Sequence, residues 1–504
     1  MKRLFTIIMI LVLSFISVFA YNSTIKDEKL LDAVYERVDT IEDKSRLERI
    51  AEKINSVKGK FKSRARIYYI LDSIQSYIEA SLDDEMADVI DGIFGDDDSD
   101  DNSEDDDSDD DSEEDDSDDN SDDDDSDSDS SDNNIANNPK NCSPLADPTW
   151  ETITVSTMTE LRNAVNTANA KGDTTILIED GTYYLDNMLY VTADNITFRG
   201  KSGDREKVIL KWKGMNGWIM HVFLVRASDF TVADLTLGWI ANHGIQIQWE
   251  HNADRPLIHN VHILDTGEQM IKGSYSKDNN IYSDDGVVEC SLMEYSVGIG
   301  PQYYIWWIDI HRGMNWVVQD NTFRGIRSPE SRWAEYAVHF WSNSSGTIVQ
   351  RNRIINCDRG IGFGLGGSPH TGWIIRNNLI YHNTSKWDVG IGLESASGVK
   401  VYNNTLYQEH SYANAIEYRF EATNNIKIIN NLTNKNISSR NGGAASLENN
   451  ITNATSSWFQ NVNQYDFELT SSGGAAKWQA KELDEVEYNI NGEEREDGWN
   501  IGAF

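Results

Sequence analysis

The sequence predicts an all-β fold, a parallel β-helix solenoid, for residues 141–470 of the 504-residue chain. Two observations carry this prediction. The first is an internal repeat of short alternating apolar segments, WVVQDNTF, TIVQRNRI, WIIRNNLI, VKVYNNTL and IKIINNLT, which aligns one asparagine in each. These are Asn321, Asn352, Asn378, Asn404 and Asn431, at spacings of 31, 26, 26 and 27 residues. The second is the length of the repeat, which is too short for the blade of a propeller. The repeats also lack the consensus of leucine-rich repeats.

Stacked coils of this period would bury Ile, Val, Leu and Phe in one continuous core, with the asparagines as a ladder at one corner. Three earlier segments, 230–237, 256–263 and 286–293, match the hydrophobic pattern, so we expect about eight coils. An amphipathic helix with Leu161, Ala164, Val165 and Ala168 precedes them and is expected to cap the first coil. Residues 471–504 are expected to form a C-terminal tail or cap.

The charge is unevenly distributed. The chain has 83 acidic and 44 basic residues, a net charge of −39, but 25 of the acids lie in residues 96–132. The remaining 58 acidic residues, set against the 44 basic ones, give the rest of the chain a net charge of only −14. Most of such a surface would repel a polyanion, so no nucleic-acid partner is expected. Residues 95–140 are Asp- and Ser-rich and are expected to form a disordered linker.

The N-terminus predicts export. Residues 1–20 begin with Lys2 and Arg3, continue as a short apolar run and end in small residues, as a secretory signal peptide does. An uncleaved membrane anchor is the alternative. After cleavage no transmembrane segment is expected, so the protein would be secreted, extracellular or held at the cell surface. Residues 21–94 have helical periodicity and predict an α-helical hairpin module, which could attach to the cell envelope or oligomerise.

The three cysteines, Cys142, Cys290 and Cys357, are too few for a disulfide framework, and their spacing fits no metal site.

Residues 174–185, 195–210 and 344–366, with the closing 485–504, resemble the secreted right-handed parallel β-helix repeat proteins of bacteria. The stretch DTGEQMIKGS (265–274) is distantly similar to the Glu and Lys segment of polysaccharide lyases of the chondroitinase B and alginate lyase type. That resemblance implies a metal-binding Glu268, with calcium as the possible cofactor, and a catalytic Lys272. The second acidic ligand of the family pattern is replaced here. The scaffold also carries hydrolases, epimerases and non-catalytic surface proteins, so it does not fix the activity.

Strand alternation predicts which side chains leave the core. If Ile245, Ile271, Ile308, Val338 and Ile361 point inward, their neighbours point outward. The outward set is Gln246, Gln248, Lys272, Asp309, His311, His339, Trp341, Gly362, Gly364, Gly392, Glu394, Glu417 and Arg419. Glycine is a poor strand residue, so the outward glycines predict a bare trough where another molecule approaches the backbone. A register error is the alternative.

This strip favours an acidic polysaccharide or a cell-surface glycan as ligand. Gln246 and Gln248 would bind hydroxyls, and Trp341, with Trp306 and Trp307, would stack on sugar rings. Glu394, Glu417 and Arg419 would border the trough.

We expect a polysaccharide lyase acting by β-elimination. Lys272 or Arg312 would neutralise a uronate carboxylate, and His311 or His339 would be the base, with Asp309 orienting an imidazole. Glu394 and Glu417 are the candidate pair for the alternative, a glycoside hydrolase. A non-catalytic surface protein for glycan binding or adhesion is the second function class.

Overall fold

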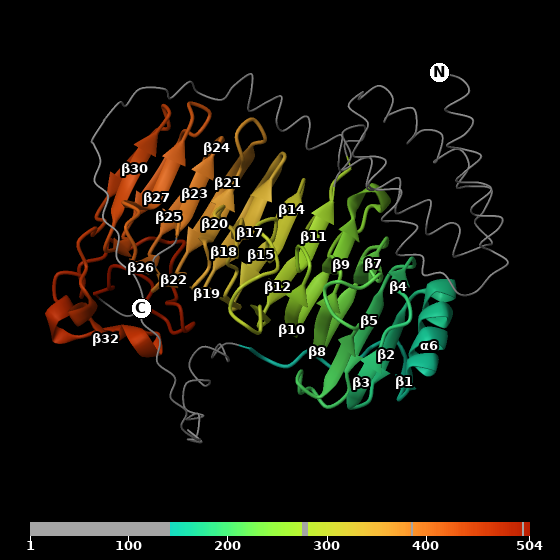
Figure 1. Cartoon of the computed structure of the whole chain (residues 1–504). Helices are drawn as coiled ribbons and strands as arrows, with labels where there is room; N and C mark the ends of the chain where they lie inside the picture. The colour runs from blue at the N-terminus through green and yellow to red at the C-terminus, as the bar shows by residue number, and fades with distance from the viewer. Residues whose placement is uncertain (1–141, 275–280, 385–386, 496–497) are drawn as a thin grey trace, which may run out of the picture. The chain divides into compact units, whose positions relative to one another are not determined.

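The computed structural model describes residues 142–504, except 275–280, 385–386 and 496–497. The predicted signal peptide, helical hairpin and linker all lie outside the described residues. The described chain is a parallel β-helix, as predicted. Each coil contributes a strand to a ten-stranded sheet and further strands to a 21-stranded sheet that covers two sides of the solenoid (Figure 1).

The ten-stranded sheet carries the predicted outward strip, and all of its strands are parallel. In coil order its strands are β4 (Leu189–Val191), β7 (His221–Val225), β9 (His243–Gln248), β11 (Ile271–Ser274), β14 (Ile308–His311), β17 (Tyr336–Trp341), β20 (Arg359–Phe363), β23 (Ile391–Glu394), β27 (Asn414–Arg419) and β30 (Asn436–Arg440). Ten strands mean that the expected eight coils were too few. The additional coils lie at the two ends, where the asparagine pattern is missing or irregular.

The 21-stranded sheet contains two series of strands. The first series is β1 (Glu151–Val155), β2 (Thr174–Ile178), β5 (Ile196–Gly200), β8 (Thr231–Ile240), β10 (Leu257–Thr266), β12 (Val287–Glu289), β15 (Val317–Gln319), β18 (Ser344–Gln350), β21 (His370–Arg376), β24 (Ala396–Ser397), β25 (Lys400–Tyr402), β28 (Ile426–Ile429) and β31 (Ala445–Glu448). The second is β3 (Gly181–Tyr184), β6 (Val208–Lys211), β13 (Leu292–Glu294), β16 (Thr322–Arg324), β19 (Arg353–Ile355), β22 (Leu379–His382), β26 (Thr405–Gln408) and β29 (Leu432–Thr433). The long β8 and β10 pair with both series.

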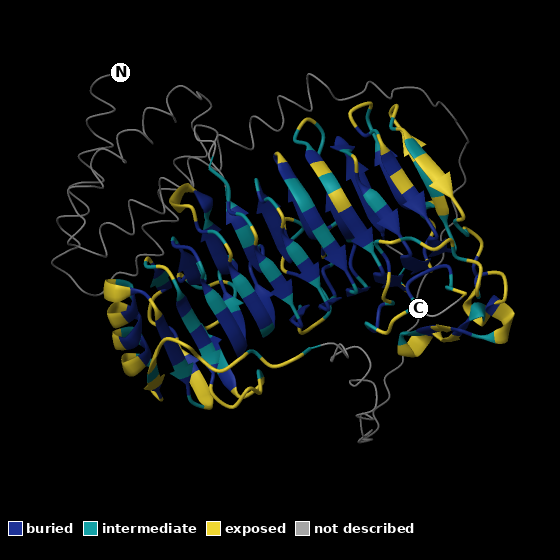
Figure 2. Cartoon of the chain, turned by 180° about the vertical axis from the view of Figure 1, so that it is seen from behind, coloured by how far each residue is buried: buried dark blue, intermediate teal, exposed yellow. Residues whose placement is uncertain are grey.

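The core is the column of inward side chains that the alternation predicts. Ile245, Ile271, Ile308, Val338 and Ile361 have no exposed surface, and Ile391 and Ile416 continue the column. Buried residues line the strands, and exposed ones gather on the cap helix and at the C-terminal end of the solenoid (Figure 2).

The asparagine ladder is present at the corner between the two series. All five asparagines are fully buried. Asn378 is representative: its Nδ2 donates to Asn404 Oδ1 (3.0 Å) and to Val349 O (2.9 Å), and its Oδ1 accepts from the backbone N–H of Asn352 (3.0 Å). The residue before each ladder asparagine has left-handed backbone, with φ between 50° and 59°. Asparagine tolerates that conformation, which explains the Asn-Asn pairs at 377–378, 403–404 and 430–431.

The N-terminal cap is helix α6 (Met158–Lys171), which buries the predicted Leu161, Ala164, Val165 and Ala168 over the first coil. A capping box between Thr157 and Glu160 begins it. None of the helices among the described residues is long and apolar enough to cross a membrane.

A disulfide joins Cys142 to Cys290, 148 residues apart, and Cys357 is free and buried. The bond holds the first described residue against the corner between β12 and β13. Arg199 holds the segment that follows Cys142, the N-terminal arm, by donating to the carbonyl oxygens of Leu145 (3.1 Å) and Ala146 (2.9 Å).

The C-terminal residues pack on the 21-stranded sheet. The short helices η3 (Ser456–Trp458), η4 (Val462–Gln464) and η5 (Ser471–Gly473) flank an antiparallel hairpin of β32 (Phe459–Asn461) and β33 (Asp466–Leu469). The remaining short helix, η2 (Trp249–His251), follows β9. Phe459 and Phe467 of the hairpin contact Tyr407 of the second series.

Candidate functional site

The predicted outward strip is in register across the ten-stranded sheet. Gln246, Lys272, Asp309, His339, Gly362, Gly392 and Glu417 are successive Cα partners on seven neighbouring strands. A second row pairs His311 with Trp341, and Glu394 with Arg419. Strand alternation therefore predicted the rows correctly. It did not predict how exposed the side chains are, because neighbouring residues, aromatic rings among them, cover most of them.

Lys272, Asp309, His311 and Trp341 form one hydrogen-bonded group, which we call the Lys272 cluster. Lys272 Nζ donates to Asp309 Oδ2, and Trp341 Nε1 donates to Asp309 Oδ1 at 2.8 Å. Lys272 Nζ also lies 3.1 Å from His311 Nε2. Asp309 has no exposed surface. Burial alone would raise its pKa, but the charge of Lys272 outweighs burial and holds the pKa of Asp309 well below its usual range.

The hydrogen bonds of His311 assign its tautomer. An ammonium group can only donate, so His311 Nε2 accepts from Lys272. The proton is then on Nδ1, which donates to Ser342 Oγ at 3.1 Å. The imidazole also packs against Trp341, with ring centroids 4.3 Å apart. His311 therefore presents a basic nitrogen to the ammonium group of Lys272.

His339 is less suited to the role of base that was expected for it. It has no exposed surface, and burial lowers its pKa to about 4. Trp306 Nε1 donates to its Nδ1 (3.3 Å), and its Nε2 lies 3.0 Å from the carbonyl oxygen of Gly364. Both ring nitrogens are occupied by protein groups. The imidazole is thus neutral and positions the Trp341 ring, on which it stacks at 5.3 Å.

The expected bare trough is wrong, because the chain fills it with its own tyrosine. A β-carbon built on Gly362 would lie 2.5 Å from the Tyr336 ring, and one on Gly392 would lie 2.1 Å from Tyr336 Oη. Tyr336 is 3% exposed and packs with Trp306, Val389 and Tyr412. The glycines do mark a close approach, as predicted, but by Tyr336. Gly364 serves a turn instead: its φ is +73° and its α-carbon faces the backbone oxygen of Glu394.

The carboxylates beyond the trough are held in ion pairs. Glu394 accepts from Arg419 (3.2 Å), and Glu417 accepts from Arg440 (3.1 Å) and Asn414 (2.7 Å) and also from Tyr412. Glu417 is 2% exposed. Two buried, charge-paired carboxylates do not fit the acid and base of a hydrolase, since neither can exchange a proton with a substrate without breaking its pair.

The glutamines lie beside the Lys272 cluster. Gln246 is buried next to Lys272, and Gln248 accepts from Arg226.

Arg312 follows β14 in left-handed backbone, with φ 51°, so it belongs to the turn and not to the outward row. The stacking expected of Trp307 is wrong, because that ring is fully buried in the core against Phe323.

Glu268 does not fit a calcium site. Nε2 of His243 lies 3.7 Å from its carboxylate, but burial lowers the pKa of His243 well below its usual range, so that imidazole is neutral. The nearby positive charge is that of Lys272. The described residues contain no group of three or more His, Cys, Asp or Glu side chains that could hold a metal ion. A calcium ion prefers several oxygen ligands, and a lysine beside the carboxylate opposes it. Burial raises the pKa of Glu268 to about 7, so near neutral pH this carboxyl carries an exchangeable proton.

The sequence analysis missed three side chains of this region, Ser342, Tyr336 and His243, and gave a fourth, Trp306, another role. Ser342 lies just beyond β17, and Tyr336 begins that strand, so neither belongs to the outward rows. Trp306 was expected to stack on a sugar but covers His339. His243 stacks on His221 of the preceding coil, at 4.8 Å. The one signal in the sequence is that His221 and His243 each begin a strand of the ten-stranded sheet.

No protein-family model and no curated protein matches the chain. Solved structures do. Pectate lyase Pel9A is 12% identical, with a TM-score of 0.46, over 73% of this chain and 98% of that one. Alginate lyase from Paenibacillus sp. str. FPU-7 is 17% identical, with a TM-score of 0.39, over 60% and 99%. The PL6 family polysaccharide lyase Pedsa3628 from Pseudopedobacter saltans is 12% identical, with a TM-score of 0.31, over 59% and 92%. Similarity at this level concerns the fold and leaves the reaction open.

Proposed function

We propose that this protein acts on an acidic polysaccharide at the Lys272 cluster, as a lyase that cleaves by β-elimination. The observation that carries the proposal is the fully buried carboxylate of Asp309, held by Lys272 and close to His311 on the outward face of the solenoid. A buried ion cluster is costly to form and marks candidate functional sites, although structural ion pairs also occur. With the predicted signal peptide, this activity would lie outside the cytoplasm or at the cell surface.

β-Elimination requires a cation near the uronate carboxylate, a base for the proton on the adjacent carbon and a donor for the leaving oxygen. Lys272 is the most accessible charged member of the cluster, with 14% of its side chain exposed, against 7% for His311 and none for Asp309. It would bind the carboxylate. Asp309 would hold both Lys272 and His311 in place.

His311 would be the base. When Lys272 turns toward a substrate carboxylate, Nε2 of His311 is freed to take the proton. The electron pair of the broken C–H bond then forms the double bond, and the glycosidic C–O bond breaks. Glu268, with its pKa of about 7, could return a proton to the leaving oxygen.

The test is product analysis with the full-length protein. Alginate, polygalacturonate, chondroitin sulfate and hyaluronan would be incubated with it, and ultraviolet absorbance of unsaturated uronides would be recorded. A lyase produces that absorbance and adds no solvent oxygen to the new chain ends. Cleavage without absorbance, and with heavy oxygen incorporated from labelled water, would instead show hydrolysis and overturn the proposal.

A non-catalytic glycan-binding protein is the second candidate. One observation favours it: the charges of the Lys272 cluster are mutually paired, and Tyr336 occupies the trough. A binder would retain one of the four polysaccharides on an affinity gel without releasing any product.

A further inference from the structure

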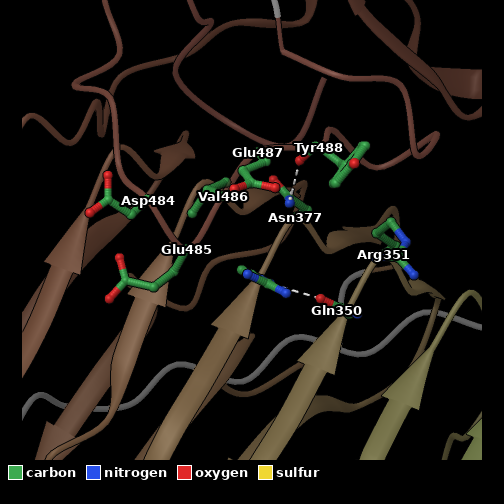
Figure 3. A pocket seen from close by; sticks show the side chains of 9 residues that line it. Gln350, Arg351, Asn377, Asp484, Glu485, Val486, Glu487 and Tyr488 are labelled. Atoms are coloured by element: carbon green, nitrogen blue, oxygen red, sulfur yellow. Dashed lines mark hydrogen bonds between the residues drawn. The ribbon is translucent and has the colours of Figure 1, made fainter.

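A pocket lies where the C-terminal segment crosses the 21-stranded sheet. The pocket there has a volume of about 170 Å³. One wall is formed by the ends of β18 and β21, with Gln350, Arg351, Arg376 and Asn377, and the other by residues 484–488 (Figure 3). It is separate from the ten-stranded sheet and has no role in the proposed elimination.

The wall of residues 484–488 is fixed in place. Val486 is 1% exposed and packs with Ile374 and Tyr402 of the sheet. Asn377 Nδ2 donates to the backbone oxygen of Tyr488 at 2.7 Å (Figure 3), and Arg495 donates to Asn377 Oδ1 at 2.8 Å. The pocket is therefore preformed, which lowers the entropy cost of binding.

Arg376 carries N–H groups that are available to a ligand. Its Nε donates to Gln350 Oε1 at 2.7 Å, which fixes the plane of the guanidinium group. The remaining N–H groups have no hydrogen-bond partner among the described residues. Partial burial, and then the charge of Arg351, lower the pKa of Arg376. Arg351 itself is satisfied by a two-pronged pair with Asp320, at 2.9 and 2.6 Å.

The facing wall is acidic. Asp484 and Glu487 are exposed there, and Glu485 pairs with Lys400. An anionic ligand would meet these carboxylates, and a cation would meet Arg376. A neutral ligand rich in hydroxyl groups avoids both conflicts, because each hydroxyl can accept from the guanidinium group and donate to a carboxylate. Tyr488 forms part of the pocket and is 47% exposed, which leaves an aromatic face for stacking.

We propose that this pocket binds an uncharged sugar residue, as an ancillary glycan site distinct from the Lys272 cluster. Its selectivity is then opposite to that proposed for the cluster. The Lys272 cluster selects a negative charge, and the Arg376 pocket rejects one through Asp484, Glu485 and Glu487.

The test is binding to the full-length protein, measured by saturation-transfer NMR and calorimetry. The probes are maltose, cellobiose, lactose and mannobiose, with trigalacturonate as the acidic probe. We expect at least one neutral disaccharide to bind. Arg376→Lys, which keeps the charge but loses the planar fork, should weaken binding by about tenfold. Glu487→Gln and Tyr488→Ala should weaken it severalfold.

The controls separate this site from the other. Tyr184→Ala removes another exposed tyrosine, 63% exposed against 47% for Tyr488, near the N-terminal end of the solenoid and should leave binding unchanged. Lys272→Ala should also leave it unchanged, so failure of the proposed lyase activity would not affect this result. Absence of binding by all four neutral sugars, stronger binding of trigalacturonate that depends on Arg376, or full binding by folded Arg376→Lys and Glu487→Gln would each overturn the proposal.

Discussion

Lys272 donates a hydrogen bond from its ammonium group to the carboxylate of Asp309 on the next coil, and Asp309 has no contact with solvent. Removal of one partner from such a buried pair leaves an uncompensated charge. We therefore expect Asp309→Asn to lower the free energy of unfolding by about 3 kcal/mol or more. The double variant Lys272→Met/Asp309→Asn should lose clearly less than the sum of the two single changes. Urea unfolding measures all three.

The matched control for that cycle is an exposed ion pair on the other sheet. Lys201 and Glu179 are paired with 47% and 41% of their side chains exposed. Glu179→Gln should cost less than about 1 kcal/mol. Additive losses for Lys272 and Asp309 would show that the two residues are not coupled in the way we describe.

Tyr336 and Gly392 predict a steric effect that can be relieved. Gly392→Ala would place a β-carbon 2.1 Å from Tyr336 Oη and 3.0 Å from the ring carbon that carries it. We expect a loss of about 1–3 kcal/mol in unfolding free energy. In a Tyr336→Phe background the hydroxyl is gone, so the same change should cost much less. Gly367→Ala, which has open space around the new carbon, is the control. Equal costs in both backgrounds would contradict the position of Tyr336.

The asparagine ladder predicts a large loss for a small change. Asn378→Ala would remove the donors to Asn404 and Val349 and leave the buried N–H of Asn352 without an acceptor. An unsatisfied buried group costs about 1–3 kcal/mol, so we expect about 2–4 kcal/mol in total. Asn187→Ala, at an exposed asparagine, should change unfolding by less than about 0.5 kcal/mol. A neutral result for Asn378→Ala would mean that the ladder contributes little to stability.

Much of this architecture could be predicted from local pattern. The period, the ladder column and the inward and outward rows depend on backbone alternation, which each strand encodes in its own residues. Hydrophobic pattern alone recovered the coils in which Ser291 and Val261 take the ladder position. The number of coils was underestimated because those at the two ends, such as the coil of β5, lack the regular repeat on which the count was based. What covers the outward rows could not be predicted in this way. Tyr336 reaches Gly392 across two coils, and the residues of a single strand do not encode such a contact.

Two further features depend on distant parts of the chain. The Cys142–Cys290 bond joins residues whose proximity follows from the path of the N-terminal arm, so three cysteines alone did not reveal it. The depressed pKa of His339 comes from its complete burial, to which Trp306 of another coil contributes, and the alternation placed His339 only on the outer face.

The burial of His339 predicts that the stability of the protein depends on pH. The pKa of His339 is about 4 in the folded protein and about 6.5 when unfolded, so between these values only the unfolded chain binds the proton. The contribution of His339 is complete above about pH 6.5 and is lost as the pH falls toward 4, by about 3 kcal/mol in all. His339→Gln should remove this part of the acid sensitivity when unfolding at pH 7.5 and 4.5 is compared. The exposed His251→Gln should behave as the parent protein. An unchanged pH dependence in His339→Gln would show that the imidazole is not shielded.

The most direct test of the Lys272 cluster is the initial rate of unsaturated-uronide formation by Lys272→Ala and His311→Ala, on whichever polysaccharide the parent protein cleaves. The account predicts that each variant loses a factor on the order of 10² or more, because each removes a group that acts on the substrate. Lys201→Ala should keep the full rate, and thermal unfolding should show that all three proteins are folded. Full activity in folded Lys272→Ala and His311→Ala would contradict the account and place the active site elsewhere on the solenoid.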